Sequence, residues 1–225
     1  MGANETSELR THAVYEALRA DLLESRIRPG ERLKFLDLAE RFGNSQTVVR
    51  EALTRLSEEG LVISSPKRGF SVMTLSTSDL IDLTNLRLSV EVGALRSSVK
   101  NGDLTWEREV VSAHHVLERT PLPNGTDHGS TWRQRHRDFH AALCSGCGSP
   151  RLQKLTSQLR DAAELYRIWS RPSGFHVGRD FAGEHKAIVQ AALARDEASA
   201  ADLLSLHLNR TTHDLLLAAE KIVDK

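Results

Sequence analysis

The chain of 225 residues has little cysteine, little proline and few aromatic residues: two Cys, six Pro, and 5% Phe, Trp and Tyr together. Two cysteines are too few for a disulfide framework and are typical of a reducing compartment. Chains built from many short strands are rich in aromatic residues and in turn residues such as Gly and Pro. Their scarcity predicts a mainly α-helical fold.

The sequence also lacks an excess of either charge and any long apolar run. Its 30 Lys and Arg balance 30 Asp and Glu, which excludes a globally basic nucleic-acid binder and leaves only a local patch for contacts with DNA. No apolar run approaches the ~18 residues that a membrane helix needs. The first ten residues, MGANETSELR, lack the apolar segment of a signal peptide. We therefore expect a cytoplasmic protein with no membrane partner.

The first 76 residues have the pattern of a winged helix-turn-helix domain. Apolar residues at helical spacing, separated by turn residues, predict helices over residues 8–26, 36–42 and 45–59. Residues 61–73, LVISSPKRGFSVM, place β-prone runs on both sides of a basic turn and predict a two-stranded hairpin. Three helices followed by a hairpin is the order of elements in this DNA-binding fold.

The third helix is the candidate recognition helix. Its apolar residues form one stripe that is expected to pack on the first two helices: Val49, Ala52, Leu53 and Leu56. The residues at its start face away from that stripe, and a recognition helix reads bases in the major groove with its N-terminal residues. Arg50 suits guanine or phosphate, and Gln46 suits adenine. We predict an interface with double-stranded DNA made of Ser45, Gln46, Thr47, Arg50, Lys67, Arg68 and Gly69.

Five separated motifs in this region resemble those of GntR-family transcription regulators. They are IRPGERL at 27–33, LAERFG at 38–43, TVVREAL at 47–53, EGLV at 59–62 and PKRG at 66–69. The resemblance covers residues 8–75 in the order of the family, and it implies a DNA-binding regulator rather than an enzyme. The family usually has Arg where Gln46 stands and Pro where Val48 stands, so the family's base preference is not carried over.

The rest of the chain shows no further hairpin signal and is predicted to form an all-helical bundle of about six helices. The fold class is therefore mainly α, with a DNA-binding domain over residues 1–76 and an effector domain over residues 77–225. The helices of the second domain are expected at about 78–99, 103–119, 129–145, 150–170, 176–194 and 196–222.

Four histidines in the second domain have the spacing of a metal site. His136 and His140 are four residues apart, so on a helix they lie one turn apart on one face. His185 and His207 lie on two further predicted helices, and imidazoles from three helices can meet inside a bundle. Nitrogen ligands suit Zn, Ni or Cu better than Mg or Ca. The spacing alone leaves open that these are ordinary helix histidines.

These histidines lie in blocks that resemble the FCD effector domain of the FadR subfamily of GntR regulators. In its metal-binding members an Asp, the histidine of a Phe-His pair four residues later, and two later histidines bind the ion. Here His136 stands in place of that Asp. The resemblance covers residues 78–222 and implies a divalent transition metal, Zn or Ni, at His136, His140, His185 and His207. Its blocks are NLRLSVE at 85–91, Phe139-His140 with Ala142-Leu143, Glu184-His185 and the late His207.

A metal ion with open coordination positions can bind the carboxylate of a small organic acid. The sequence therefore predicts a repressor whose operator affinity is controlled by a small carboxylate effector bound near the metal. Arg87, Tyr166 and Arg210 are the candidate effector-binding residues, although a salt bridge to Glu91 one turn away is an equal alternative for Arg87. Two DNA-binding domains on the two halves of a pseudopalindromic operator provide affinity that a single domain lacks, so we expect a homodimer.

The sequence is also compatible with other functions of the second domain. The effector domain can bind an acyl-CoA-like or other ligand without a metal. A metal-dependent hydrolase is a more distant alternative, because Arg137 follows His136 and the HExxH pattern with its general-base Glu is absent. Cys144-Ser145-Gly146-Cys147 is a CxxC motif, which is a weak signal for redox or zinc chemistry when no second motif accompanies it.

Overall fold

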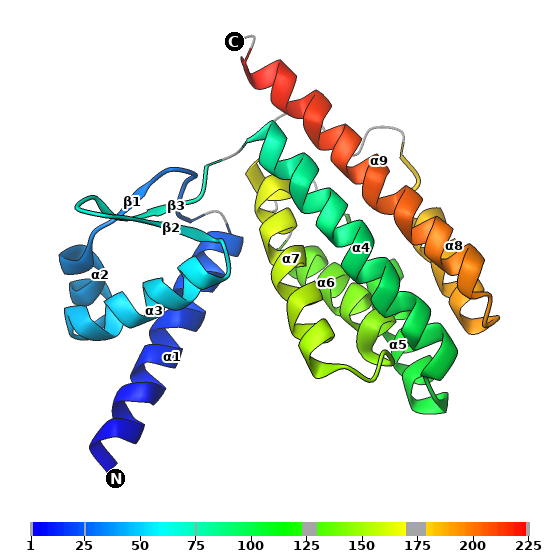
Figure 1. The fold of residues 1–225 in the computed structure, drawn as a ribbon, viewed down its shortest axis with the longest axis horizontal. Helices are drawn as coiled ribbons and strands as arrows, with labels where there is room; N and C mark the ends of the chain where they lie inside the picture. The colour runs from blue at the N-terminus through cyan, green and yellow to red at the C-terminus, as the bar shows by residue number, and fades with distance from the viewer. Residues whose placement is uncertain (1, 25, 75, 123–129, 170–178, 224–225) are drawn as a thin grey trace. The chain divides into compact units, whose positions relative to one another are not determined.

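The computed structural model describes residues 2–24, 26–74, 76–122, 130–169 and 179–223 (Figure 1). The chain divides into two compact units. Unit 1 comprises Met1–Ser76 and Glu164–Trp169, and unit 2 comprises Thr77–Ala163 and Ser170–Lys225. None of the described helices is long and apolar enough to cross a membrane.

Unit 1 contains three helices and a small antiparallel sheet, which confirms the winged helix-turn-helix prediction. The second of these helices ends at Gly43, which adopts a left-handed backbone with φ 59°. The third begins where the Ser45 hydroxyl caps the Val48 N–H at 3.4 Å. Its predicted apolar stripe is fully buried and packs against the first helix. The elements are α1 (Gly2–Leu23), β1 (Arg32–Leu33), α2 (Phe35–Phe42), α3 (Gln46–Glu58), β2 (Val62–Ser65) and β3 (Gly69–Val72).

The sheet has three strands in the order β1-β3-β2, so the prediction of a two-stranded hairpin was incomplete. In β1, Arg32 is paired with Ser71 and Leu33 with Phe70. A strand of two residues has no alternation to detect in a sequence, and it forms because β3 offers a free edge. The first helix also begins earlier than expected, at Gly2. Residues 2–7 are mostly polar, so apolar periodicity could not indicate them.

The helices of unit 2 agree in number with the predicted bundle. Figure 1 shows α4 and α9 side by side along much of their length. The core between the helices is apolar and closed, with Phe139, Leu143, Ile188 and Leu204 at 0–1% exposure. The last six residues of α7 belong to unit 1. The helices are α4 (Thr77–Asn101), α5 (Leu104–Arg119), α6 (Ser130–Ser145), α7 (Pro150–Trp169), α8 (Phe181–Leu193) and α9 (Glu197–Val223).

Helix α8 begins at Phe181, five residues later than the start expected at 176. Asp180 caps it, since its Oδ1 accepts a hydrogen bond from the Gly183 N–H at 2.8 Å. The remaining start of the expected helix, residues 176–178, lies outside the described residues. This late start places Arg179 immediately before the helix that carries His185.

Candidate metal centre and DNA interface

The structure brings the four predicted ligand histidines together inside unit 2. His136 and His140 come from successive turns of α6, His185 from α8 and His207 from α9. All four side chains are buried, at 2–3% exposure. One ring nitrogen from each lies within 4.8 Å of the others, and the Nε2 atoms of His136 and His140 are 3.1 Å apart. The helices α6, α8 and α9 thus bring four imidazole nitrogens close enough together to bind one metal ion.

Burial keeps His140 and His185 in the neutral form that a metal requires. Desolvation lowers the pKa of His140 and His185 well below the usual value, and the neighbouring His207 lowers both further. The rings are therefore neutral near pH 7 and have a lone pair to offer. Among the described residues, the buried Nε2 of His185 has no hydrogen-bond partner. A buried polar atom without a partner is costly, and a metal ion would satisfy it. The residues fit a transition metal.

Glu184 fixes the orientation of one of these rings. Its Oε2 accepts a hydrogen bond from Nδ1 of His207 at 2.8 Å. Metal-binding histidines commonly have such a carboxylate partner. Burial raises the pKa of Glu184, but hydrogen bonds from His207 and Arg179 lower it by more, so the net pKa lies below the ordinary value. The carboxylate is therefore charged.

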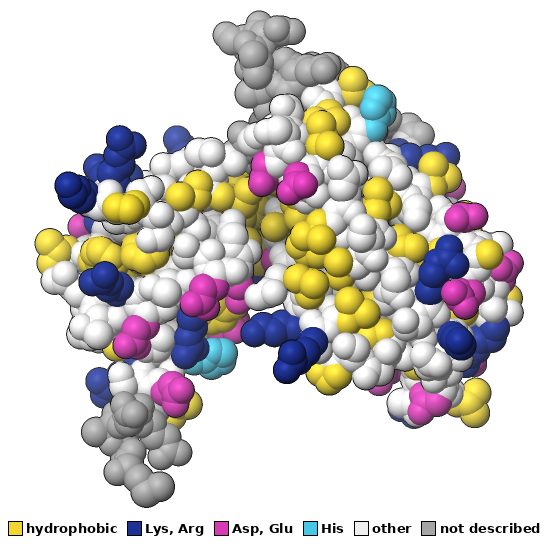
Figure 2. Space-filling view, in the orientation of Figure 1, with side chains coloured by type: hydrophobic (Ala, Val, Ile, Leu, Met, Phe, Trp, Pro, Cys, Tyr) yellow, Lys and Arg dark blue, Asp and Glu magenta, His cyan; other side chains and the backbone are white. Residues whose placement is uncertain are grey.

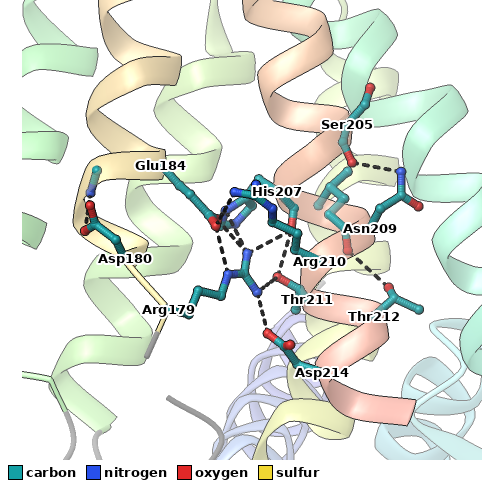
Figure 3. Close-up of polar contacts among 12 residues, drawn as sticks. Arg179, Asp180, Glu184, Ser205, His207, Asn209, Arg210, Thr211, Thr212 and Asp214 are labelled. Carbon is teal, nitrogen blue, oxygen red and sulfur yellow. Dashed lines mark hydrogen bonds and ion pairs between the residues drawn. The ribbon is translucent and has the colours of Figure 1, made fainter. Parts of the chain in front are cut away.

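Arg179 holds that carboxylate from the segment before α8 (Figure 3). Its Nη2 and Nε contact Oε2 and Oε1 of Glu184 at 2.6 and 3.0 Å. The same guanidinium donates to Asp214 Oδ2 at 2.9 Å and to the His207 carbonyl at 3.1 Å, which ties the start of α8 to α9. No sequence motif pointed to Arg179 or to the carboxylate of Glu184. Only the position of Glu184 next to His185 could have indicated it.

The three predicted effector residues are in three different surroundings. Arg210 donates from Nη1 to Glu184 Oε1 at 3.1 Å and lines a polar cavity of about 880 Å³ beside α8 and α9. Arg87 is buried and its Nε donates to Glu91 at 2.6 Å, which is the salt bridge that the sequence left as an alternative. Tyr166 belongs to unit 1, and its hydroxyl donates to the Ser76 carbonyl at 3.2 Å. The structure therefore does not gather these three residues into one pocket.

The surroundings of the CxxC motif do not favour a reactive thiolate at Cys144. Both Cys144 and Cys147 are buried and free. Burial raises the pKa of Cys144 to about 12. Because the thiolate is the reactive form, a thiol with this pKa is inert near neutral pH.

The predicted DNA-contacting residues of unit 1 lie on its surface. Gln46, Thr47 and Arg50 are exposed at the start of α3, and Lys67 and Arg68 are exposed in the turn between β2 and β3. Lys67 and Gly69 both have positive φ, 63° and 79°, and Gly adopts this backbone without strain. Figure 2 shows Lys and Arg side chains gathered where Figure 1 places this turn.

One basic residue of this surface was missed by the sequence analysis. The exposed Arg32 on β1 donates from Nη2 to the Arg68 carbonyl at 3.1 Å, so it extends the basic wing. Its contact depends on the pairing of β1 with β3, which joins residues about 40 positions apart in the sequence. No local pattern could have indicated it.

Two family models match the chain, one in each part. The gntR family of bacterial regulatory proteins matches residues 10–72. The FCD domain matches residues 82–210, which is more than half of the chain. The boundary between the two matches falls at the start of α4.

Curated proteins and solved structures resemble the chain over most of its length. It is 38% identical over 203 residues to the HTH-type transcriptional regulator BphR of Paraburkholderia xenovorans (strain LB400), covering 87% of this chain and 81% of that protein. It is 31% identical over 198 residues to the HTH-type transcriptional repressor GlaR of Escherichia coli (strain K12), covering 86% and 90%. The crystal structure of a GntR regulator from Rhodococcus sp. RHA1 superposes with a TM-score of 0.76 at 25% identity, covering 92% and 97%.

Proposed function

The chain belongs to the GntR family of bacterial transcription regulators and carries an FCD domain, and on this basis we propose that it is a metal-dependent, effector-controlled repressor. Residues 1–76 would read the operator, and residues 77–225 would bind the effector. The observation that carries the metal part of the proposal is the convergence of four buried imidazoles from three helices.

The proposed ligands are His136, His140, His185 and His207. Nitrogen ligands favour Zn or Ni, and a bound ion with an open position would accept a carboxylate oxygen of the effector. Glu184 would hold the ring of His207 with its Nε2 toward the ion, and Arg179 would hold Glu184. Effector control then acts on the helices α6, α8 and α9, because each of them supplies at least one ligand.

The proposed effector is a small organic carboxylate. Arg87 and Arg210 are the cations proposed to contact it, because a guanidinium can bind a carboxylate through two parallel hydrogen bonds. The predicted site also included Tyr166, whose hydroxyl contacts the backbone at Ser76, one residue before α4. Because Ser76 and Tyr166 both belong to unit 1, this contact supports a structural role for Tyr166 within that unit.

The proposed DNA interface consists of Ser45, Gln46, Thr47 and Arg50 on α3 with Lys67, Arg68 and Gly69 in the wing. The exposure of these side chains and the cap at Ser45 support it. Helix N-termini also favour phosphate groups. Two copies of this DNA-binding domain in a homodimer would bind the two halves of a pseudopalindromic operator. The regulator name GlaR, a repressor, supports the direction of control.

Metal analysis of the purified full-length protein tests the central proposal. We expect about one Zn or Ni ion per chain, and a lower midpoint of thermal unfolding after chelation, since a ligand that binds only the folded state stabilises it. The His140→Ala variant should not bind the ion. The control variant His115→Ala, which changes an exposed histidine of α5, should bind it as the wild type does. A wild-type protein without a bound ion, and with no response to chelator, would overturn the proposal.

The direction of effector control is tested separately by gel-shift titration. The proposal expects small carboxylates to weaken binding to the operator of the metal-loaded protein. A carboxylate that strengthens binding would show that the effector is a corepressor and would contradict the release mechanism.

A further inference from the structure

A second cavity of unit 2 lies away from the histidine cluster. It has a volume of about 700 Å³ and is lined by α5, α6 and α7. On α6 its lining includes Asp138, Ala141 and Ser145. At 100° per residue these positions lie on the side of the helix opposite His136 and His140. None of the four histidines lines this cavity.

The floor of this cavity is Arg160, which belongs to a buried ionic cluster with one more cation than anion. Arg87, Glu91 and Arg160 are exposed by 3%, 1% and 5%. Glu91 contacts Arg87 Nε at 2.6 Å through Oε1, and Arg160 Nη1 at 3.4 Å through Oε2. Among the described residues, Glu91 is the one carboxylate within ion-pair distance of either guanidinium. A buried charge without a counter-charge is costly, so the cluster favours an additional anion.

Arg160 uses only one of its nitrogens to hold the protein. Its Nη1 donates to Glu91 at 3.4 Å, to the His140 carbonyl at 3.4 Å and to Cys144 Sγ at 3.8 Å. The two contacts to oxygen are longer than the usual 2.7–3.2 Å of an N–H···O hydrogen bond. The Nε and Nη2 atoms make no hydrogen bond to any described residue. Those two atoms form the edge of a guanidinium that binds a carboxylate in bidentate fashion.

The rim of the cavity limits the charge of its ligand. Arg108 is exposed there and makes no ion pair with a described residue. Asp138 is already engaged by Arg135 at 3.4 Å, and Glu109 accepts a hydrogen bond from Ser145 at 3.3 Å. The presence of two carboxylates at the rim disfavours a multiply charged anion such as phosphate. A single carboxylate matches the single surplus charge of the cluster.

We propose that this cavity is a second ligand site, which binds a small organic carboxylate through the Nε and Nη2 edge of Arg160. Glu109 and the hydroxyl groups of the lining are positioned for a hydroxyl or amino group on the same ligand. Because Arg160 also holds the His140 carbonyl, occupancy acts directly on α6. The site requires no metal ion, so it stands independently of the function proposed above.

The test uses the full-length protein in excess chelator, with glycolate as the probe and acetate, succinate and phosphate as further probes, each against NaCl of equal ionic strength. Glycolate should bind in a calorimetric titration and raise the midpoint of thermal unfolding. Arg160→Gln should weaken its binding by about 10-fold or more, as expected for loss of a charged hydrogen-bond pair. Arg151→Gln, an exposed arginine of α7 outside the cavity, should bind as the wild type does.

A second variant protects the test against misfolding of Arg160→Gln. Ser112→Trp adds a bulky side chain to the cavity from the exposed face of α5 and leaves Arg87, Glu91 and Arg160 unchanged in sequence, and it should also weaken glycolate binding. Wild-type binding in both cavity variants, equal or better binding of phosphate, or no binding of any carboxylate by the chelated wild type would each overturn the proposal.

Discussion

The two units of this protein place their functional charges in opposite ways. In unit 1 the cations proposed to contact DNA, Arg50, Lys67 and Arg68, are exposed around an apolar core. In unit 2 the groups at the centre of the proposed sites are buried: the four histidines, Arg87, Glu91 and Arg160. A long polyanion can only be met at a surface, whereas a small ion or acid can be enclosed. Burial then makes each charge interact more strongly with its partners.

The largest effect should come from removing the shared counter-ion of the buried cluster. Glu91→Gln keeps the shape of the side chain but leaves Arg87 and Arg160 without a buried anion. We expect a loss of about 3–5 kcal/mol in the free energy of unfolding, measured by denaturant titration. Glu197→Gln, which removes an exposed ion pair to Arg96 at 3.5 Å, should cost less than about 1 kcal/mol. Equal losses in the free energy of unfolding for the two variants would contradict the expected difference between buried and exposed ion pairs.

The next effect concerns an exposed cation. Arg50→Ala should leave the stability of unit 1 unchanged, because the side chain is exposed. It should weaken specific operator binding by about 10- to 100-fold, the range for one bidentate base contact. Arg119→Ala, an exposed arginine of unit 2, serves as the control in the same fluorescence-anisotropy titration. Retained specific affinity in Arg50→Ala would refute its assignment to the recognition surface.

The next prediction concerns Glu184, which contacts the proposed metal ligand His207. A change in metal affinity of similar size is expected when its carboxylate is removed. Glu184→Gln replaces the carboxylate that accepts the His207 Nδ1 hydrogen bond. Loss of such a partner typically lowers metal affinity by about 10- to 100-fold, measurable by competition with a chromophoric chelator. Asp138→Asn removes a carboxylate from α6 on the side away from the histidines and should leave the affinity unchanged. The same affinity in both variants would show that Glu184 has only a structural role.

The smallest effect should be that of the wing. Lys67→Ala should weaken binding to specific and nonspecific DNA by a similar factor of a few, because a phosphate contact carries no sequence information. The slope of log affinity against log salt concentration should fall by about one unit. Lys186→Ala in unit 2 provides the charge-matched control. An unchanged slope for Lys67→Ala would place the wing away from the DNA backbone.

Features that depend on short stretches of sequence were predictable. The helix α3 followed from one apolar stripe and its cap at Ser45, and both are present in the structure. The placing of His136 and His140 on one face followed from a spacing of four residues. The class of fold followed from the order of helices and wing. In each case the signal lies within one or two turns of chain, where helical geometry fixes which side chains are neighbours.

Features that depend on packing between distant elements were not predictable. The strand β1 is too short to show a pattern, so Arg32 was missed as a part of the wing. For Arg87 the sequence left two partners equally open; the structure pairs it with Glu91, and only the packing of the helices brings Arg160 of α7 to the other oxygen of that carboxylate. The hydrogen bond from His207 to Glu184 joins residues 23 positions apart on two helices.

By itself, the sequence determined a mainly helical regulator, the exposed face at the start of α3 that is proposed to contact DNA, and the four histidines that are proposed to bind a metal. Local periodicity and residue chemistry suffice for these. The tertiary structure alone decided that the four imidazoles meet within 4.8 Å, that Arg179 and Glu184 support them, and that a buried cluster with surplus positive charge opens onto a second cavity. These features depend on how helices pack, and helix packing brings together atoms whose separation along the chain carries no signal.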